Sequence, residues 1–367
     1  MTYHLRVLGV SVVLRGPESV LGPVVGAYRR FLVPDPAADG THEIVVESAS
    51  STSFADGSTT VPVIDGMGPT LQVYERFLLA VFDRVSSHAV LHAGALVAPG
   101  GEALLIAGPS GFGKTSLTLE LLVRGLGFLS DDYAPIELAT GSVHPYPRTV
   151  GLLPGGSART PQVFVEAAQK PELPRLLGKA LIDVGDVLGE AVLATDPVSV
   201  DNVVFLDADR AEGDYRSVVH LGVWHHGISE AAGMIEEALG ADVLERTDRK
   251  DITIWCIGLR LERMQTERFS DLLDRDFVAF HETLPGSTPE FEAEPRLTPI
   301  RPRDMALLLC REIQNRRRRG SLMQAYNGDT TRLFLDVASA LARARCYRLN
   351  VGNFESTANL LEQLART

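Results

Sequence analysis

The chain has few cysteines and no excess of positive charge. Only three of its 367 residues are cysteine, and Cys256, Cys310 and Cys346 are far apart. An odd number at these spacings gives neither a disulfide framework nor a cysteine-based metal site. The net charge of −12 argues against broad binding to nucleic acid or to an anionic membrane surface. These features favour a reducing compartment, and we expect a cytoplasmic location.

Long apolar runs are also missing from the sequence. No apolar run reaches the roughly 18 residues that span a bilayer. The N-terminus, MTYHLRVLGVSVVLRG, alternates like a strand and lacks the apolar core of a signal peptide. The composition, 45% hydrophobic and 22% charged, is that of a globular protein, and the length allows two or three domains.

Two domains are expected from the order of the elements. Residues 1–85 predict a small α/β lobe, with strands over 3–14 and 43–47, an amphipathic stretch over 21–32 and a helix over 71–85. Residues 86–367 predict an α/β catalytic domain. Near its end, residues 284–303 read as a proline-rich loop, and helices are expected over 304–319 and 330–344.

A glycine-rich loop lies between an expected strand and an expected helix. GPSGFGKTS contains the whole G-x-x-x-x-G-K-[ST] pattern after the strand at 103–107. Its glycines allow turns that direct successive N–H groups at phosphate oxygens, and the following helix adds a positive dipole end. Lys114 is expected to reach the β- and γ-phosphates, and the Thr115 hydroxyl to bind Mg²⁺. The predicted nucleotide site comprises Gly108, Pro109, Ser110, Gly111, Phe112, Gly113, Lys114, Thr115 and Ser116. ATP and Mg²⁺ are the expected cofactors, although no motif distinguishes ATP from GTP.

Two adjacent aspartates follow this loop at a short distance along the chain. The intervening helix of about ten residues spans roughly 15 Å, and Gly125 and Gly127 allow the chain to reverse. The next strand is expected to run parallel to strand 103–107, as in a right-handed crossover. Its C-terminal end would then bring Asp131 and Asp132 beside the phosphate loop. One carboxylate could face Mg²⁺ and the other an acceptor hydroxyl; alternatively, the pair caps a turn.

A histidine and an arginine are further candidates. His92 lies on the strand that precedes the loop strand, and it could support the site or be an ordinary core histidine. Arg148, in HPYPRTVGL, could stabilise charge on a transferring phosphoryl group or be an ordinary surface arginine.

Residues 88–152 resemble the catalytic domain of bacterial HPr kinase/phosphorylase. They are more similar still to HPr-kinase-like proteins of peptide natural-product clusters, a family distantly related to ATP-dependent phosphoenolpyruvate carboxykinase. The shared pattern is a histidine on a strand, a hairpin, a phosphate loop, a helix, an Arg-Gly turn and an Asp-Asp pair. The matching residues are His92, Gly108, Ser110, Gly111, Gly113, Lys114, Thr115, Arg124, Gly125, Asp131 and Asp132.

The resemblance implies a fold and roles for several residues. The fold implied is α/β, a P-loop core like that of HPr kinase and phosphoenolpyruvate carboxykinase, with a small N-terminal α/β lobe. In that family the Asp pair supplies a base and a metal contact, and the histidine supports the site. We therefore expect Asp131 as the base, Asp132 with Thr115 at the metal, and His92 beside them. YPRTVGL lacks the glutamate that HPr kinases have after the pair, so HPr is not implied as the acceptor.

The predicted function is that of an ATP-dependent kinase acting on a hydroxyl, a Ser or Thr of a peptide or small protein. Lys114, Asp131, Asp132, Arg148 and His92 are its expected catalytic residues. A small-molecule kinase and a non-catalytic nucleotide-binding module are the alternatives. Residues 1–85 are expected to help dock the acceptor, with Arg316–Arg319 as a contact for an acidic segment. No nucleic-acid or membrane partner is expected, and homo-oligomerisation is left open.

Overall fold

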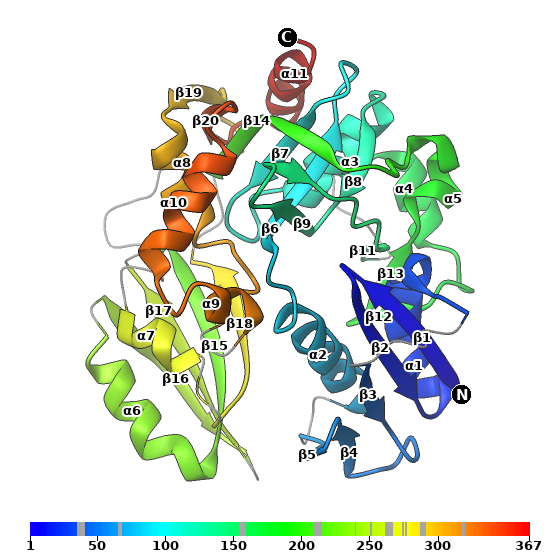
Figure 1. Cartoon of the computed structure of the whole chain (residues 1–367), viewed down its shortest axis with the longest axis vertical. Helices are drawn as coiled ribbons and strands as arrows, with labels where there is room; N and C mark the ends of the chain where they lie inside the picture. The colour runs from blue at the N-terminus through cyan, green and yellow to red at the C-terminus, as the bar shows by residue number, and fades with distance from the viewer. Residues whose placement is uncertain are drawn as a thin grey trace.

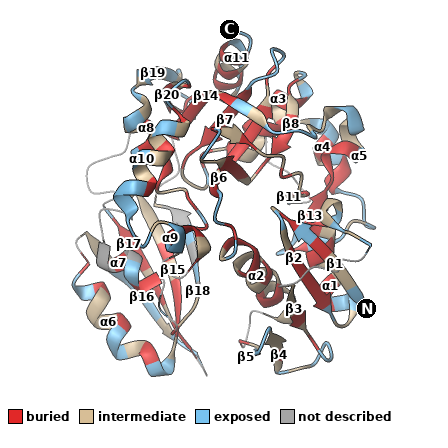
Figure 2. Ribbon diagram, in the orientation of Figure 1, coloured by how far each residue is buried: buried red, intermediate tan, exposed pale blue. Residues whose placement is uncertain are grey.

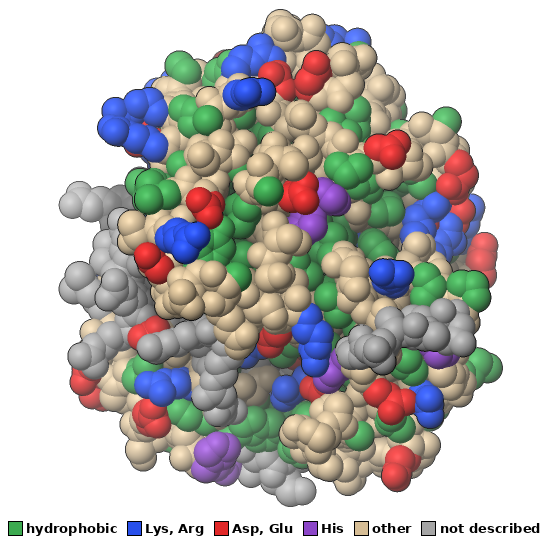
Figure 3. Space-filling model, viewed as in Figure 1, with side chains coloured by type: hydrophobic (Ala, Val, Ile, Leu, Met, Phe, Trp, Pro, Cys, Tyr) green, Lys and Arg blue, Asp and Glu red, His purple; other side chains and the backbone are tan. Residues whose placement is uncertain are grey.

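The computed structural model is a mixed α/β structure with several sheets (Figure 1). It describes the whole chain except residues 35–40, 65–67, 154–158, 209–214, 239, 250–251, 261–266, 274, 276, 287–290 and 318–319. No helix within the described residues is both long and apolar enough to cross a membrane. On the face in Figure 3, Lys and Arg side chains lie scattered among Asp and Glu side chains.

A five-stranded sheet forms the N-terminal part, in the order β1-β2-β3-β4-β5. Residues 3–14, expected as one strand, form a hairpin, because Leu8 and Gly9 both have positive φ and reverse the chain. The helices are α1 (Glu18–Ala27), the short η1 (Arg29–Phe31) and α2 (Pro69–Phe82). The strands are β1 (Thr2–Val7), β2 (Val10–Arg15), β3 (His42–Val45), β4 (Ser53–Asp56) and β5 (Thr59–Pro62).

A central sheet carries the expected catalytic core, in the order β10-β9-β6-β7-β14-β20-β19, with β8 also paired to β6. The strands β7, β14 and β20 are parallel, whereas β6 and β19 are antiparallel to their neighbours. The strands are β6 (His88–Val97), β7 (Ala103–Ala107), β8 (Gly127–Ser130), β9 (Tyr133–Glu137), β10 (Ser142–Val143), β14 (Val198–Asp207), β19 (Arg296–Ile300) and β20 (Arg345–Asn350).

Helices cover both faces of this sheet, and its middle strands are buried (Figure 2). Alternate residues of β7 belong to different clusters: Leu104 and Ile106 pack with α3 and α11, whereas Leu105 packs with α8, α9 and α10. Such near-continuous apolar strands are typical of parallel sheets with two covered faces. The helices are α3 (Lys114–Val123), α11 (Phe354–Ala365), α8 (Pro302–Leu309), α9 (Ser321–Ala325) and α10 (Thr330–Ala340).

The strand after α3 differs from expectation in its neighbour. β8 runs in the same direction as β7, but β6 lies between them and pairs antiparallel with both. β8 and β9 follow one another along the same edge of β6, and Asp131 and Asp132 lie at the junction. Ala93 of β6 pairs with Ala107, the last residue of β7, and donates its N–H to the Asp132 carbonyl 3.2 Å away. The carboxylates therefore lie one strand away from the start of the phosphate loop.

Two smaller sheets complete the structure. One consists of β11 (Val150–Leu152), β13 (Lys179–Ile182) and β12 (Arg175–Leu176), beside α4 (Gln162–Ala168), α5 (Val184–Leu188) and η2 (Glu190–Val192). The other, in the order β16-β17-β15-β18, lies between β14 and β19 in the sequence and has its own apolar cluster with α6 and α7. Its elements are β15 (Ser217–Trp224), η3 (His225–Gly227), α6 (Ile228–Glu236), β16 (Ala241–Asp248), β17 (Ile252–Leu259), α7 (Glu267–Leu273) and β18 (Val278–Pro285). The expected domain of residues 86–367 thus contains a separate sheet that the sequence did not indicate.

Two expectations near the C-terminus were wrong in extent. The stretch 284–303, expected as a loop, contains β19, because Arg296–Ile300 pairs with β20. The helix expected over 304–319 ends at Leu309, and the chain then runs beside β6, with Ile313 bridging to Leu91.

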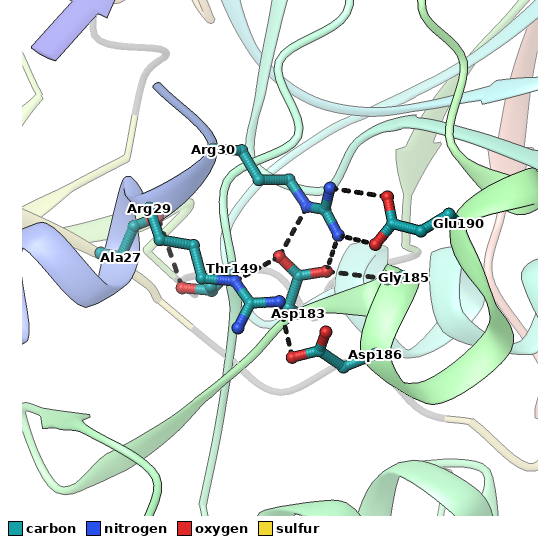
Figure 4. A network of polar contacts seen from close by, with 8 residues as sticks. All are labelled: Ala27, Arg29, Arg30, Thr149, Asp183, Gly185, Asp186 and Glu190. Atoms are coloured by element: carbon teal, nitrogen blue, oxygen red, sulfur yellow. Dashed lines mark hydrogen bonds and ion pairs between the residues drawn. The ribbon is translucent and has the colours of Figure 1, made fainter. Parts of the chain in front are cut away.

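The N-terminal sheet and its helices share a core with the rest of the protein. The apolar cluster around Phe77 of α2 includes Val90 of β6, Tyr146, Leu176 and Leu181. Charged contacts add to it, since Arg29 and Arg30 of η1 bind Asp183 at the start of α5 (Figure 4). Residues 1–85 therefore have their own sheet and a core shared with later residues.

Candidate active site

The phosphate loop begins where β7 ends and leads directly into α3. Gly108, Gly111 and Gly113 all have positive φ, a region that suits glycine and lets the backbone turn tightly. α3 begins at Lys114, and no described side chain caps its N-terminus. Its first N–H groups and its positive dipole end are therefore available to an anion.

Lys114 is buried at the base of this loop. Its Nζ donates to the carbonyl oxygens of Gly108 at 2.6 Å and Pro109 at 3.0 Å. Burial lowers the pKa of Lys114, although Glu312, Asp132 and Asp131 favour its charged form. The amino group thus stands inside the loop, and nearby carboxylates partly offset the cost of burying it.

Phe112 anchors the phosphate loop through its side chain. Its side chain is fully buried in the apolar cluster that contains Leu117 and Leu206. It anchors the loop to the core, so it can contribute only its backbone to a phosphate. Ser110 and Ser116 are half-buried on the loop and at the first turn of α3.

Asp131 lies against the hydroxyl expected to bind the metal. The Thr115 Oγ1 donates to Asp131 Oδ2 across 3.3 Å, whereas Asp131 Oδ1 is buried with no hydrogen-bond partner among the described residues. Burial, and next the charge of Asp132, raise the pKa of Asp131 to about 6. The carboxyl group can therefore exchange a proton near neutral pH.

Asp132 is held between the His92 imidazole and the Arg148 guanidinium. Its Oδ1 lies 3.2 Å from His92 Nε2, and its Oδ2 lies 3.0 Å from the Arg148 guanidinium. Burial favours the neutral acid, but Arg148 and the His92 hydrogen bond outweigh it and lower the pKa of Asp132. The two aspartates are adjacent in sequence, yet they have opposite electrostatic surroundings.

His92 connects this pair to a carboxylate that the sequence analysis missed. Its Nδ1 lies 3.5 Å from Glu312 Oε2, and its backbone N–H donates to the Glu312 carbonyl at 2.8 Å. Burial and Lys114 oppose protonation, but the hydrogen bonds with Asp132 and Glu312 raise the pKa of His92. The sequence offered little indication of Glu312, because the glutamate lies in an arginine-rich stretch, residues 311–319, whose most evident feature is its positive charge.

Arg148 reaches the site from the segment before β11. Besides Asp132, its guanidinium donates to the Tyr74 hydroxyl at 2.7 Å and lies over the Tyr133 ring, 5.1 Å from its centre. Only 13% of its side chain is exposed. The alternative of an ordinary surface arginine is therefore wrong. Tyr74, on α2, brings the N-terminal part of the chain to the edge of the site.

Other residues singled out in the sequence lie apart from this network. Arg124 binds Glu120 on its own helix and Glu355 and Glu362 on α11, so it joins two helices. In the arginine-rich stretch, Arg317 lies 3.4 Å from Asp83, at the end of α2. Arg318 and Arg319 lie outside the described residues.

The described residues fit a nucleotide with a divalent cation. An uncapped helix N-terminus behind a glycine-rich turn suits phosphate. The Thr115 hydroxyl and the Asp131 Oδ2 that it contacts are hard oxygen ligands of the kind that Mg²⁺ prefers. Lys114 and Arg148 lie close enough for their positive charges to lower the pKa of Asp131 in part.

The chain is distantly similar in structure to a known protein. No model of a protein family matches the sequence, and no curated protein matches it. Among solved structures, the Hpr(Ser) kinase/phosphatase from Coxiella burnetii is similar to part of the chain, with 20% sequence identity and a TM-score of 0.23. The aligned region covers 35% of this chain and 75% of that one.

Proposed function

We propose that the protein is an ATP-dependent kinase that transfers a phosphoryl group to a hydroxyl, a Ser or Thr of a peptide or small protein. The observation that carries the proposal is the Thr115–Asp131 contact. It joins the loop that would hold the phosphates to a buried carboxyl group whose pKa is raised to about 6. Phosphoryl transfer needs a positioned donor and a group that can accept the proton of the attacking hydroxyl.

Each residue of the network has a part in this proposal. The loop backbone and Lys114 would hold the phosphates, and Mg²⁺, when bound, would neutralise charge on their oxygens. Thr115 would bind the cation together with a carboxylate of the pair. Asp131 would accept the hydroxyl proton, because its Oδ1 is free among the described residues and its pKa lies near the operating range.

Asp132 would chiefly position its neighbours. Both of its oxygens already have partners, one on His92 and one on Arg148, so its expected role as a metal ligand stays a prediction that the contacts do not favour. The ion pair with Asp132 would orient Arg148 toward the site. There the planar guanidinium can stabilise charge on the transferring group. His92, between Asp132 and Glu312, would keep Asp132 in place.

The test is nucleotide binding and phosphoryl transfer with a Lys114→Ala variant. We expect weaker binding of Mg-ATP by calorimetry and a loss of transfer from labelled ATP, with an unchanged unfolding temperature. Lys170→Ala is the matched control, because Lys170 is an exposed lysine at the end of α4. Wild-type affinity and activity in Lys114→Ala would contradict the proposal.

A further outcome separates the kinase from a nucleotide-binding module. A peptide library and small hydroxyl compounds are incubated with labelled ATP and analysed by mass spectrometry. Transfer to a Ser or Thr side chain supports the proposal, and transfer to a small molecule supports the alternative kinase. Stoichiometric nucleotide binding without transfer to any acceptor would favour the regulatory module.

A further inference from the structure

A second polar cluster lies at the far end of β6 and β9, outside the network around Asp131. His88, Glu137 and His144 each offer one ligand atom, and these atoms all lie within 4.8 Å of one another. His88 and Glu137 are direct partners across the β6–β9 ladder, and His144 follows β10, the next strand.

The sheet geometry places the three side chains on one face. Ser142 of β10 is the partner of Glu137, and the backbone N–H of His144, two residues after Ser142, donates to the Pro135 carbonyl of β9. Side chains two residues apart on paired strands point to the same side of a sheet. The alternating residues Ala89, Ile136 and Val143 pack into the apolar cluster on the opposite side. The regular strands therefore hold these ligands in place.

Two imidazole nitrogens in this cluster have no hydrogen-bond partner among the described residues, although one of them lies 3.7 Å from Glu137 Oε2. They are the Nε2 atoms of His88 and His144, both buried from solvent. The His88 side chain belongs to a residue that is only 9% exposed. Its other nitrogen, Nδ1, contacts Ser87 Oγ at 2.9 Å, which fixes the orientation of the ring. Buried polar atoms without hydrogen-bond partners are uncommon, and a bound water or ion is one explanation for them.

Further contacts hold the side chains of the cluster in place. Thr140 Oγ1 donates a hydrogen bond to Glu137 Oε2 across 2.7 Å. The rings of His88 and His144 meet edge to face, 4.4 Å between centres.

Another acidic cluster in the protein is already occupied by arginines. Asp183, Asp186 and Glu190 also lie close together, but Arg29 and Arg30 bind all three (Figure 4). The Arg29 Nε, for example, lies 2.7 Å from Asp183 Oδ2. The guanidinium groups neutralise these carboxylates, so the network joins η1 to α5 and offers no free ligands.

We propose that His88, Glu137 and His144 bind a transition-metal cation of the zinc class. Two histidines and one carboxylate form a ligand set that zinc accepts, with a solvent molecule at the remaining position. Mg²⁺ prefers oxygen ligands and is the poorer match for two imidazoles. The proposal does not depend on the kinase activity.

The metal would also stabilise the segment that carries Arg148. His144 is four residues before Arg148, and the intervening Tyr146 donates its N–H to the Leu129 carbonyl of β8. A cation that joins His144 to β6 and β9 would hold the start of this segment against the central sheet. Metal binding should therefore raise the unfolding temperature of the whole protein.

The experiment is zinc binding to the full chain without a polyhistidine tag, in excess Mg²⁺. After equilibrium dialysis, elemental analysis should find one Zn²⁺ per chain, and Co²⁺ should give the visible absorption of a low-coordinate imidazole site. In Glu137→Gln and His144→Ala we expect at least about tenfold weaker Zn²⁺ binding. Loss of a residue that only supports a metal ligand already weakens metal affinity by about 10- to 100-fold. Both positions are partly exposed, so these variants should fold even if His88→Ala does not.

His226→Ala is the control, because His226 is an exposed histidine in η3. It should bind Zn²⁺ as the wild type does. Zinc affinity that is unchanged in Glu137→Gln and His144→Ala would overturn the assignment of these ligands. A wild-type chain that binds no Zn²⁺ would overturn the site itself and would leave the two rings as a packing contact.

Discussion

Two adjacent aspartates differ in this protein because their side chains meet different neighbours. Asp131 faces the Thr115 hydroxyl from a buried position, whereas Asp132 is held by Arg148 and His92. The charge of Asp132 also raises the pKa of Asp131, so the strong ion pair of one residue helps to make the other a base. Divergent pKa values in one pair of carboxyl groups often mark separate catalytic roles.

The first prediction concerns the pH dependence of phosphoryl transfer. A base acts in its ionised form, and the pKa of Asp131 is raised to about 6, so kcat/KM should fall as the pH drops through about 6. Asp131→Asn should abolish this fall of kcat/KM at low pH and lower kcat by about 10²- to 10⁴-fold. The measurement is a pH–rate profile of both proteins, with Asp196→Asn, an exposed aspartate, as the control. A wild-type profile that stays flat across this range would rule out Asp131 as the base.

Arg148 should act mainly in the transition state. Arg148→Lys keeps the charge but loses the planar guanidinium that contacts Asp132 and Tyr74 together. We expect kcat to fall by about 10-fold or more, with a smaller change in KM for ATP. Steady-state kinetics of Arg148→Lys against Arg343→Lys, an exposed arginine, measure this difference. If KM changes and kcat does not, Arg148 binds the nucleotide instead.

At the scale of elements, α2 contributes to the site through one hydroxyl. Tyr74 accepts a hydrogen bond from Arg148, so Tyr74→Phe should lower the free energy of unfolding by about 1 to 2 kcal/mol. It should also lower kcat, because Arg148 loses one of the contacts that orient it. Thermal unfolding and kinetics can be compared with Tyr3→Phe, which removes a hydroxyl bound to Glu18 in the same part of the chain. Equal kinetics in the two variants would show that Tyr74 only adds stability.

The helices α3 and α11 are joined by Arg124. Its guanidinium contacts Glu120, Glu355 and Glu362, and 15% of its side chain is exposed. Arg124→Ala would leave these carboxylates without their cation, and we expect a loss of about 1 to 3 kcal/mol in the free energy of unfolding. Chemical denaturation, with Arg343→Ala as the control, tests this. A loss no larger than that of the control would mean that α11 is held by its apolar face alone.

At the scale of the whole molecule, residues 1–85 share an apolar core with the rest of the chain. Their removal would expose Val90, Tyr146, Leu176 and Leu181, which share their apolar cluster, and would delete Tyr74 from the site. We therefore expect a chain without residues 1–85 to unfold at a lower temperature or to aggregate. Calorimetry or fluorescence melting checks this expectation. A truncated chain that melts like the full protein would show that the shared cluster contributes little.

The docking role of this part stays a prediction, and it needs a milder test than truncation. Exchange of exposed residues on the N-terminal sheet leaves the shared cluster intact. Arg6→Glu, on β1, changes an exposed charge there. If this surface docks the acceptor, such changes should raise the acceptor KM and leave ATP binding unaltered.

The sequence by itself determined the elements whose conformation depends on residues close together in the chain. The glycine-rich loop, α3 and the Asp pair were all predicted, because turn and helix preferences act over a few residues. The hairpin of β6 and β7 was predicted for the same reason, and it placed His92 beside the loop strand.

Tertiary structure alone decided which distant residues complete the site. Arg148 and Tyr74 are 74 positions apart, and Glu312 meets His92 only because the chain after α8 returns to β6. The separate β15–β18 sheet and the His88–Glu137–His144 cluster likewise depend on strand register and order. Contacts of this kind come from packing the whole chain, since no local preference records which strands will pair.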